Sequence, residues 1–95
     1  MDRDELLTLA QRYVWFTPPD EVVDHNLRRL VAAVMEQGTY EDAHALLAHL
    51  GESAFIRALT DHPIGALSDK SLAFWHYRLR QPGTPPRARR RGLVA

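Results

Sequence analysis

Apolar side chains recur every three or four residues along most of this 95-residue chain, and no stretch shows alternation of apolar and polar residues. The three- to four-residue period places apolar side chains on one face of an α-helix, whereas alternation would place them on one face of a strand. The pattern predicts an all-α fold, a compact bundle of about five short helices.

Residues that start and stop helices divide this pattern. Thr17 and Thr39 each precede an aspartate by three residues, which is a short form of the capping box, and Ser68 is a further expected N-cap. Gly38 and Gly51 are expected helix stops. The predicted helices cover about residues 3–14, 18–37, 40–50, 52–61 and 69–80. The second of these is expected to be the longest.

A chain of this length supports one modest hydrophobic core. We expect residues 1–80 to form a single helical domain and residues 81–95 to form a Pro- and Arg-rich tail. The apolar stripes assign the following residues to the core: Val23, Leu27, Leu30, Val34, Leu46, Leu47, Leu50, Phe55, Leu59, Leu72 and Trp75.

The formal net charge of zero conceals a strong segregation of charge. Residues 1–69 carry all 12 acidic side chains and five basic ones, a net charge of −7, whereas residues 70–95 carry seven basic side chains and no acidic one. The tail offers little apolar surface to offset the entropy lost on ordering. We expect it to be disordered in isolation or strapped across an acidic surface.

The sequence does not predict a metal or cofactor site. The absence of cysteine excludes disulfides, thiol nucleophiles and cysteine-ligated metals. Glu41 and His44 have the Glu-x-x-His spacing of di-iron helical bundles, but those bundles need a second such pair and two further glutamates. His49 lies five residues from His44, so the two imidazoles face apart.

Arg57 and His62 are separated by four residues, which is similar to the Arg-x(4–6)-His motif of helical ribonucleases of the HEPN type. That resemblance implies an arginine that steadies phosphate charge and a histidine that transfers the proton. The motif fixes only two positions, however, and Pro63 disfavours helical geometry at His62. We therefore expect a surface arginine and a helix-terminal histidine, no catalytic residue and no enzymatic activity. A HEPN-like ribonuclease is the weaker alternative.

The aromatic residues and the tail arginines are the candidates for a binding surface. A domain of this size cannot bury all its aromatic side chains, and aromatic and arginine side chains are enriched at protein interfaces. We assign six residues to a partner-binding surface: Phe16, Phe74, Arg87, Arg89, Arg90 and Arg91.

Nucleic-acid binding is a second hypothesis for the function. The arginines of residues 87–91 are not interleaved with aromatic residues, so their contacts with nucleic acid would be electrostatic and non-specific. The net charge of −7 on residues 1–69 repels phosphates and weighs against dedicated binding. We retain a nucleic-acid-binding regulator that uses the tail as the alternative.

Three short stretches resemble a family of small bacterial and archaeal proteins encoded beside nucleotidyltransferase toxins of the abortive-infection type. The match covers about residues 13–80. Its stretches are Val14-Trp15-Phe16 before an acidic proline turn, Glu36-Gln37-Gly38-Thr39-Tyr40-Glu41-Asp42, and Leu67-Ser68-Asp69-Lys70-Ser71-Leu72-Ala73-Phe74-Trp75. The resemblance implies an antitoxin-like protein that binds and neutralises a toxin enzyme, and it assigns no individual binding residue. The N-terminal helix and the tail depart from the family pattern.

The sequence also bears on location. Its start is charged, from Asp2 to Glu5, and its longest apolar run, Leu30 to Met35, has six residues. A secretory signal needs a positive start and an apolar core, and a membrane-spanning helix needs about 20 apolar residues. We expect a cytoplasmic protein that is monomeric or weakly dimeric.

Overall fold

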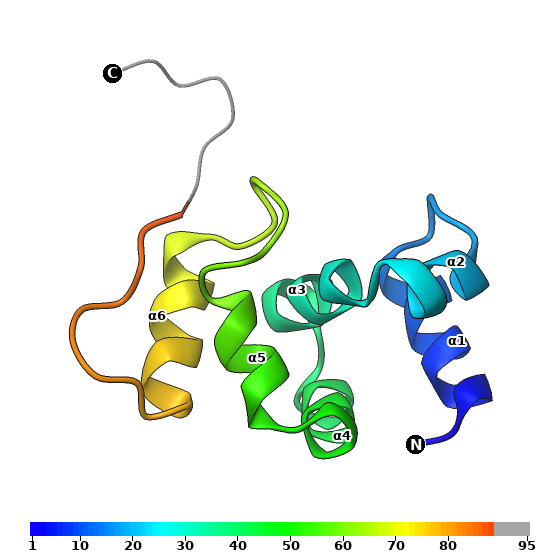
Figure 1. Ribbon diagram of the computed structural model, residues 1–95, viewed down its shortest axis with the longest axis horizontal. Coiled ribbons are helices and arrows are strands. Elements are labelled where there is room, and N and C mark those ends of the chain that lie inside the picture. Colours follow the sequence, from blue (N-terminus) through cyan, green and yellow to red (C-terminus); the bar gives the residue numbers. More distant parts are fainter. Residues whose placement is uncertain (89–95) are drawn as a thin grey trace.

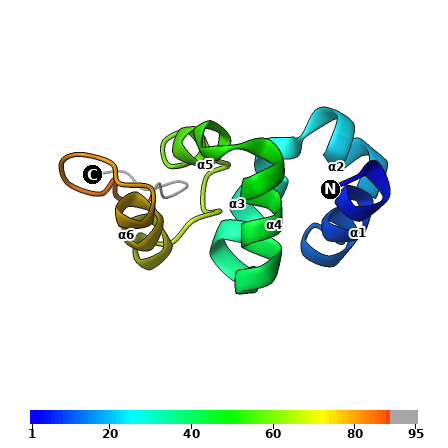
Figure 2. The ribbon, with the colours of Figure 1, turned by 90° about the horizontal axis from the view of Figure 1, so that it is seen from below.

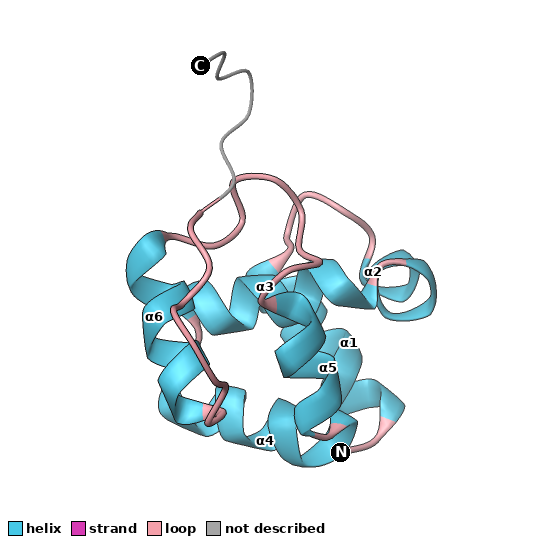
Figure 3. Cartoon of the chain, turned by 60° about the vertical axis from the view of Figure 1, so that its left-hand side comes forward, coloured by secondary structure: helices cyan, strands magenta, loops and turns pink. Residues whose placement is uncertain are grey.

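The computed structural model describes residues 1–88 and confirms the all-α prediction, with six helices and no strand in that range (Figures 1 and 3). The helices are α1 (Arg3–Tyr13), α2 (Pro19–His25), α3 (Leu27–Gln37), α4 (Tyr40–Leu50), α5 (Glu52–Ala58) and α6 (Asp69–Arg78). α3 lies between the α1–α2 pair and the α5–α6 pair (Figures 1 and 2). None of the helices described is long and apolar enough to cross a membrane.

The prediction of one long helix over residues 18–37 is wrong, because Asn26 divides this stretch into α2 and α3. Asn26 has φ −146° and ψ 47°, which lie outside the helical region. Its amide donates to the Val22 carbonyl at 3.0 Å and its carbonyl accepts from the Arg29 amide at 3.1 Å, so the backbone at the break is hydrogen-bonded. Asparagine is a weak helix former. The break lets α2 pack on α1 while α3 contacts α1, α4, α5 and α6.

Two of the three predicted N-caps are confirmed. The Thr39 hydroxyl oxygen accepts a hydrogen bond from the Asp42 amide at 3.1 Å and starts α4. The Ser68 hydroxyl oxygen accepts from the Ser71 amide at 3.2 Å and starts α6. Each hydroxyl pairs with one of the amides that the first turn of a helix leaves unpaired.

The predicted Thr17 cap is wrong. α2 begins at Pro19, and its N-cap is Pro18, with φ −53°, ψ 133° and no side-chain capping bond. A residue that precedes proline is disfavoured in the helical region, so Pro19 holds Pro18 extended. The helix therefore starts one residue too late for the Thr17 hydroxyl to cap it.

Both predicted glycine stops are confirmed, for different physical reasons. Gly51 has φ 87°, a left-handed conformation that glycine adopts at little cost. Gly38 has an extended backbone, with φ −69° and ψ 152°. At Gly38 a side chain would collide with the carbonyl oxygen of Val34, so the position requires glycine for space.

All six helices contribute to the core. Seven residues of the predicted set are buried: Leu30, Val34, Leu46, Phe55, Leu59, Leu72 and Trp75. The prediction is wrong for the other four, Val23, Leu27, Leu47 and Leu50, which are only partly buried. In α2 the break at Asn26 changes the helix direction, and Val22 takes the buried position in place of Val23.

Asp42 joins α1 to α4. Its carboxylate accepts hydrogen bonds from the Tyr13 hydroxyl at 2.5 Å and from the Arg12 guanidinium at 2.7 Å. The Tyr13 oxygen in turn accepts from the Thr39 amide at 3.3 Å. The hydrogen bond from Tyr13, together with the pairing to Arg12, outweighs the cost of desolvation and holds the pKa of Asp42 below its usual value.

Two leucines of α3, both predicted from the sequence to be in the core, differ in burial and allow that difference to be tested. Leu30 is fully buried and Leu27 is partly buried. We expect Leu30→Ala to lower the free energy of unfolding by about 2–5 kcal/mol, because it removes buried apolar contacts and leaves a cavity. The matched variant Leu27→Ala should lower it by less than about 2 kcal/mol. Urea unfolding followed by circular dichroism measures both, and equal losses would contradict the structure.

The Asp42 contacts predict a pH dependence. Because the pKa of Asp42 is lowered on folding, its contribution to stability is complete above the unfolded pKa of about 4 and is lost as the pH falls through the folded value. We expect the free energy of unfolding to drop less steeply below about pH 4 in Asp42→Asn than in the unmodified chain. Urea unfolding at several pH values measures the slope.

Candidate functional site

Two surface grooves flank the start of α6. The α4–α6 groove has a volume of about 510 Å³ and is lined by Val34, Met35, Glu36, Gly38, Thr39, Tyr40, Ala43, His44, Ser68, Lys70, Ser71, Phe74, Trp75 and Arg78. The Phe16 groove has a volume of about 480 Å³ and is lined by Tyr13, Val14, Phe16, Arg29, Ala33, Glu36, Gln37, Gly65, Ala66, Leu67, Ser68, Asp69 and Ala88. Both volumes are in the range of small ligand pockets.

Glu36 and Ser68 line both grooves and form the boundary between them. The Glu36 carboxylate accepts from the Ser68 amide at 2.9 Å and from the Ser68 hydroxyl at 3.2 Å. Burial opposes the charge of Glu36, but hydrogen bonds from the Ser68 amide and from the Ser71 and Ser68 hydroxyls outweigh it, so the pKa of Glu36 is lowered. This ionised carboxylate fixes the start of α6 against the end of α3.

Phe74 forms the α6 wall of the α4–α6 groove. Its side chain is 60% exposed, although its neighbour Trp75 is buried. The two rings meet edge to face, with centroids 5.3 Å apart. Trp75 is held by a hydrogen bond from its indole N–H to the Met35 carbonyl at 3.0 Å. Phe74 is therefore an exposed aromatic ring on a rigid base.

The opposite wall comes from the start of α4. Tyr40 is 76% exposed, and its ring lies 4.1 Å from the His44 ring between centroids, at an interplanar angle of 32°. Across the groove, Arg78 donates to the His44 Nε2 at 3.5 Å. Tyr40 is not among the binding residues that the sequence predicts. Its position at the first turn of a helix, beside a polar cap, was the available signal.

Lys70 and Arg78 carry the positive charge of this groove. They lie four residues before and four residues after Phe74, so all three side chains share one side of α6. Within the described part of the chain, neither cation has a carboxylate in ion-pair distance, unlike Arg3, Arg12 and Arg28. The groove thus combines an aromatic wall with two cations that have no acidic partner among those residues.

The structure does not bring Phe16 and Phe74 together. Phe16 is also 60% exposed, but it lies in the neighbouring groove. The Arg29 guanidinium lies 5.7 Å from the centre of the Phe16 ring, in cation–π geometry, and the Trp15 ring contacts Phe16 edge to face. The Phe16 ring is therefore already engaged on one face by a side chain of α3.

The chain reverses after α6. The Arg80 amide donates to the Tyr77 carbonyl at 3.1 Å and the Gln81 amide to the His76 carbonyl at 3.0 Å, the paired bonds of a Schellman motif. Arg80 has φ 58°, the left-handed conformation that glycine usually provides there. Residues 81–88 return along α6 (Figure 1).

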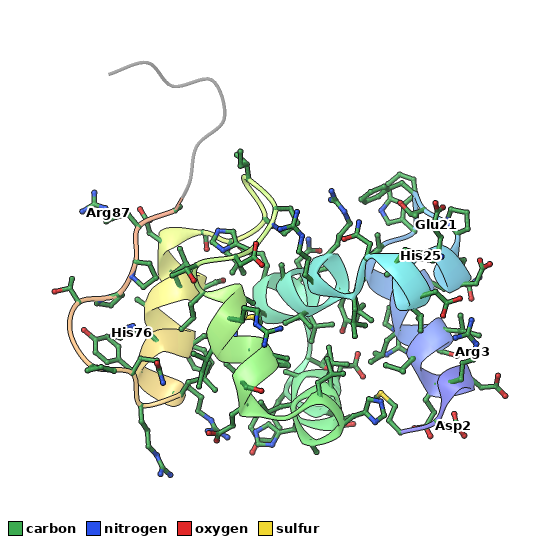
Figure 4. The ribbon with its side chains drawn as sticks, viewed as in Figure 1. Asp2, Arg3, Glu21, His25, His76 and Arg87 are labelled. Atoms are coloured by element: carbon green, nitrogen blue, oxygen red, sulfur yellow. The ribbon has the colours of Figure 1, made fainter. Side chains whose placement is uncertain are left out.

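The returning segment is held at two points. A His76 ring nitrogen donates to the Gly83 carbonyl at 3.0 Å, and the Ala88 amide donates to the Asp69 carboxylate at 2.6 Å. Arg87 is exposed on the outer side of this segment, far from α1 and α2 (Figure 4). The other predicted binding arginines, Arg89, Arg90 and Arg91, lie outside the described residues.

Arg57 and His62 do not form an accessible pair. Arg57 is exposed, but the His62 side chain is only 1% exposed, not a surface group. Its Nδ1 donates to the Ala58 carbonyl at 2.7 Å, and its Nε2 is buried without a partner. A buried imidazole cannot reach a ribose hydroxyl in this conformation, so the geometry disfavours the ribonuclease hypothesis.

No metal site is found among residues 1–88, where no group of three or more potential ligands is close enough to hold an ion. Comparison with known proteins gives no further assignment: no protein family, no curated protein and no solved structure matches this chain. Any functional assignment therefore depends on the geometry of the site and on the resemblance seen in the sequence.

Arg57 and His62, the two positions of the weaker ribonuclease alternative, should differ in their contribution to stability. We expect His62→Ala to lower the free energy of unfolding by about 2–4 kcal/mol, because it opens a cavity and leaves the Ala58 carbonyl unpaired. Arg57→Ala should change it by less than about 0.5 kcal/mol. Urea unfolding measures both, together with cleavage of a labelled RNA. If the unmodified chain cleaves RNA and each substitution abolishes cleavage while the protein stays folded, the result would support the ribonuclease hypothesis.

Proposed function

We propose that this chain is a non-enzymatic protein-binding module, an antitoxin-like partner and inhibitor of a nucleotidyltransferase-type toxin. The observation that carries the binding role is the exposed Phe74 ring, held on the buried Trp75 within a groove of about 510 Å³. Rigid aromatic anchors beside arginine are typical of interface hot spots. The class of the partner comes from the sequence resemblance.

The tail gives this proposal a second element. Arg87 is exposed on the segment that returns along α6, next to the residues that continue to Arg91. Basic side chains at the rim of an interface mainly raise the rate of association with an acidic partner. Toxin enzymes of this class hold divalent metals with carboxylates, so an arginine-bearing tail has an acidic target there.

The equal exposure of Phe74 and Phe16 allows a matched test. We expect Phe74→Ala to weaken binding of the proposed nucleotidyltransferase partner by at least about tenfold, because it removes the anchor of the groove. The proposal places the anchor in the α4–α6 groove and not at the sequence-predicted Phe16, whose ring lies in the other groove against Arg29. Phe16→Ala, with the same exposed fraction, should therefore change the affinity by less than about threefold. Calorimetry on the purified pair measures both constants, with circular dichroism as the check of folding.

Two results would contradict the proposal. One is a neighbouring gene that encodes no nucleotidyltransferase, together with no capture of such an enzyme by the intact chain. The other is capture that neither phenylalanine affects. Tight binding of nucleic acid that falls steeply with salt and requires residues 87–91 would favour the nucleic-acid-binding alternative.

A further inference from the structure

We propose that the α4–α6 groove binds an acidic amphipathic helix, with apolar side chains against Phe74 and with carboxylates against Lys70 and Arg78. The inference rests on the protein-binding function proposed above and specifies the chemistry of the segment that is bound. It follows from charge, spacing and backbone hydrogen bonding at the groove.

The charge of the groove selects an acidic occupant. Lys70 and Arg78 have no acidic partner among the described residues, and Arg78 has only the weak contact with His44. Glu36, the acidic residue of the lining, is already paired with Ser68. Carboxylates placed against the two cations would meet unpaired positive charge, and desolvation by an apolar face between them would strengthen both contacts.

The spacing of the cations sets the spacing of the carboxylates. Lys70 and Arg78 are eight residues apart on α6, which corresponds to about 12 Å along the helix axis. A helix that lies along the groove places side chains seven or eight residues apart at about the same separation. Apolar residues in the turn between them would face Phe74, which lies midway between the cations.

Backbone hydrogen bonding favours a helix over an extended segment. Extended peptides gain affinity by adding a strand to an exposed sheet edge, and residues 1–88 contain no strand. The groove walls are parts of three helices and their caps, which offer no continuous row of unpaired amides and carbonyls to an extended segment. An extended segment would lose water from most of its backbone without a regular set of partners in return, whereas a helix supplies its own backbone hydrogen bonds.

A protein segment also fits the surroundings better than nucleic acid. Residues 1–69 carry a net charge of −7, and Glu36 lines the groove itself. A phosphate backbone carries a charge at every nucleotide and would be repelled by Glu36 and by the net negative charge of residues 1–69. A helix carries its carboxylates at chosen positions and avoids that repulsion.

The test is a selection from a displayed library of random peptides of about 18 residues, long enough for a helix, on the immobilised full chain. We expect enriched peptides to carry Asp or Glu seven or eight residues apart with apolar residues between them. Fluorescence anisotropy of a selected peptide should show a dissociation constant at least about tenfold higher for the double variant Lys70→Glu/Arg78→Glu. Phe74→Ala should raise it similarly.

A charge exchange separates recognition from loss of structure. The selected peptide with its two acidic residues changed to lysine should bind the double variant better than it binds the unmodified chain. Arg57→Glu, a reversal at an exposed arginine of α5, should leave the affinity for the acidic peptide within about threefold. Circular dichroism confirms that each variant is folded.

Three outcomes would overturn the inference: no enrichment of acidic amphipathic peptides, affinity that the double variant does not change, or tighter binding of a single-stranded oligonucleotide at the same cations. The proposed function fails separately. Successful selection without capture of a nucleotidyltransferase contradicts only the class of partner. Capture of the toxin that Lys70→Glu/Arg78→Glu leaves unchanged contradicts only the acidic helix.

Discussion

The hydrogen bond from the Trp75 indole to the Met35 carbonyl, 3.0 Å long and buried, is the contact on which the arrangement of α6 depends. Met35 lies in the last turn of α3, where carbonyl groups lack intrahelical partners, and a buried indole N–H requires an acceptor. One bond satisfies both groups. The Trp75 ring also lies 5.3 Å from the Phe55 ring between centroids, which joins α5 to the same contact.

The groove follows from this attachment. α4 and α6 each pack on α3, and the space between them is the α4–α6 groove. Glu36, next to Met35, accepts a hydrogen bond from the Ser68 amide at the start of α6. Two successive residues at the end of α3 therefore hold α6 at two points, Ser68 and Trp75. Because Trp75 is buried, Phe74 points away from the core and is left exposed in the groove.

The sequence predicted the fold class and most helix ends because these depend on residues within about one turn. The caps at Thr39 and Ser68 and the stop at Gly51 were correct for this reason. The wrong predictions also have local physical causes. The Thr17 cap fails because Pro19 holds Pro18 extended. The single long helix fails because Asn26 breaks the helix although the apolar stripe runs on past it. The stripe carried across that break then misassigned part of the core.

The sequence by itself determined that the chain is helical, where most helices end, and that a domain of this size cannot bury all its aromatic side chains. Only the tertiary structure decided that the two phenylalanines face different grooves, that Tyr40 stands opposite Phe74, and that His62 is buried. Helix periodicity and capping are set by neighbours in the chain. The partners across a groove are instead set by contacts between helices distant in sequence, such as that of Trp75 with Met35.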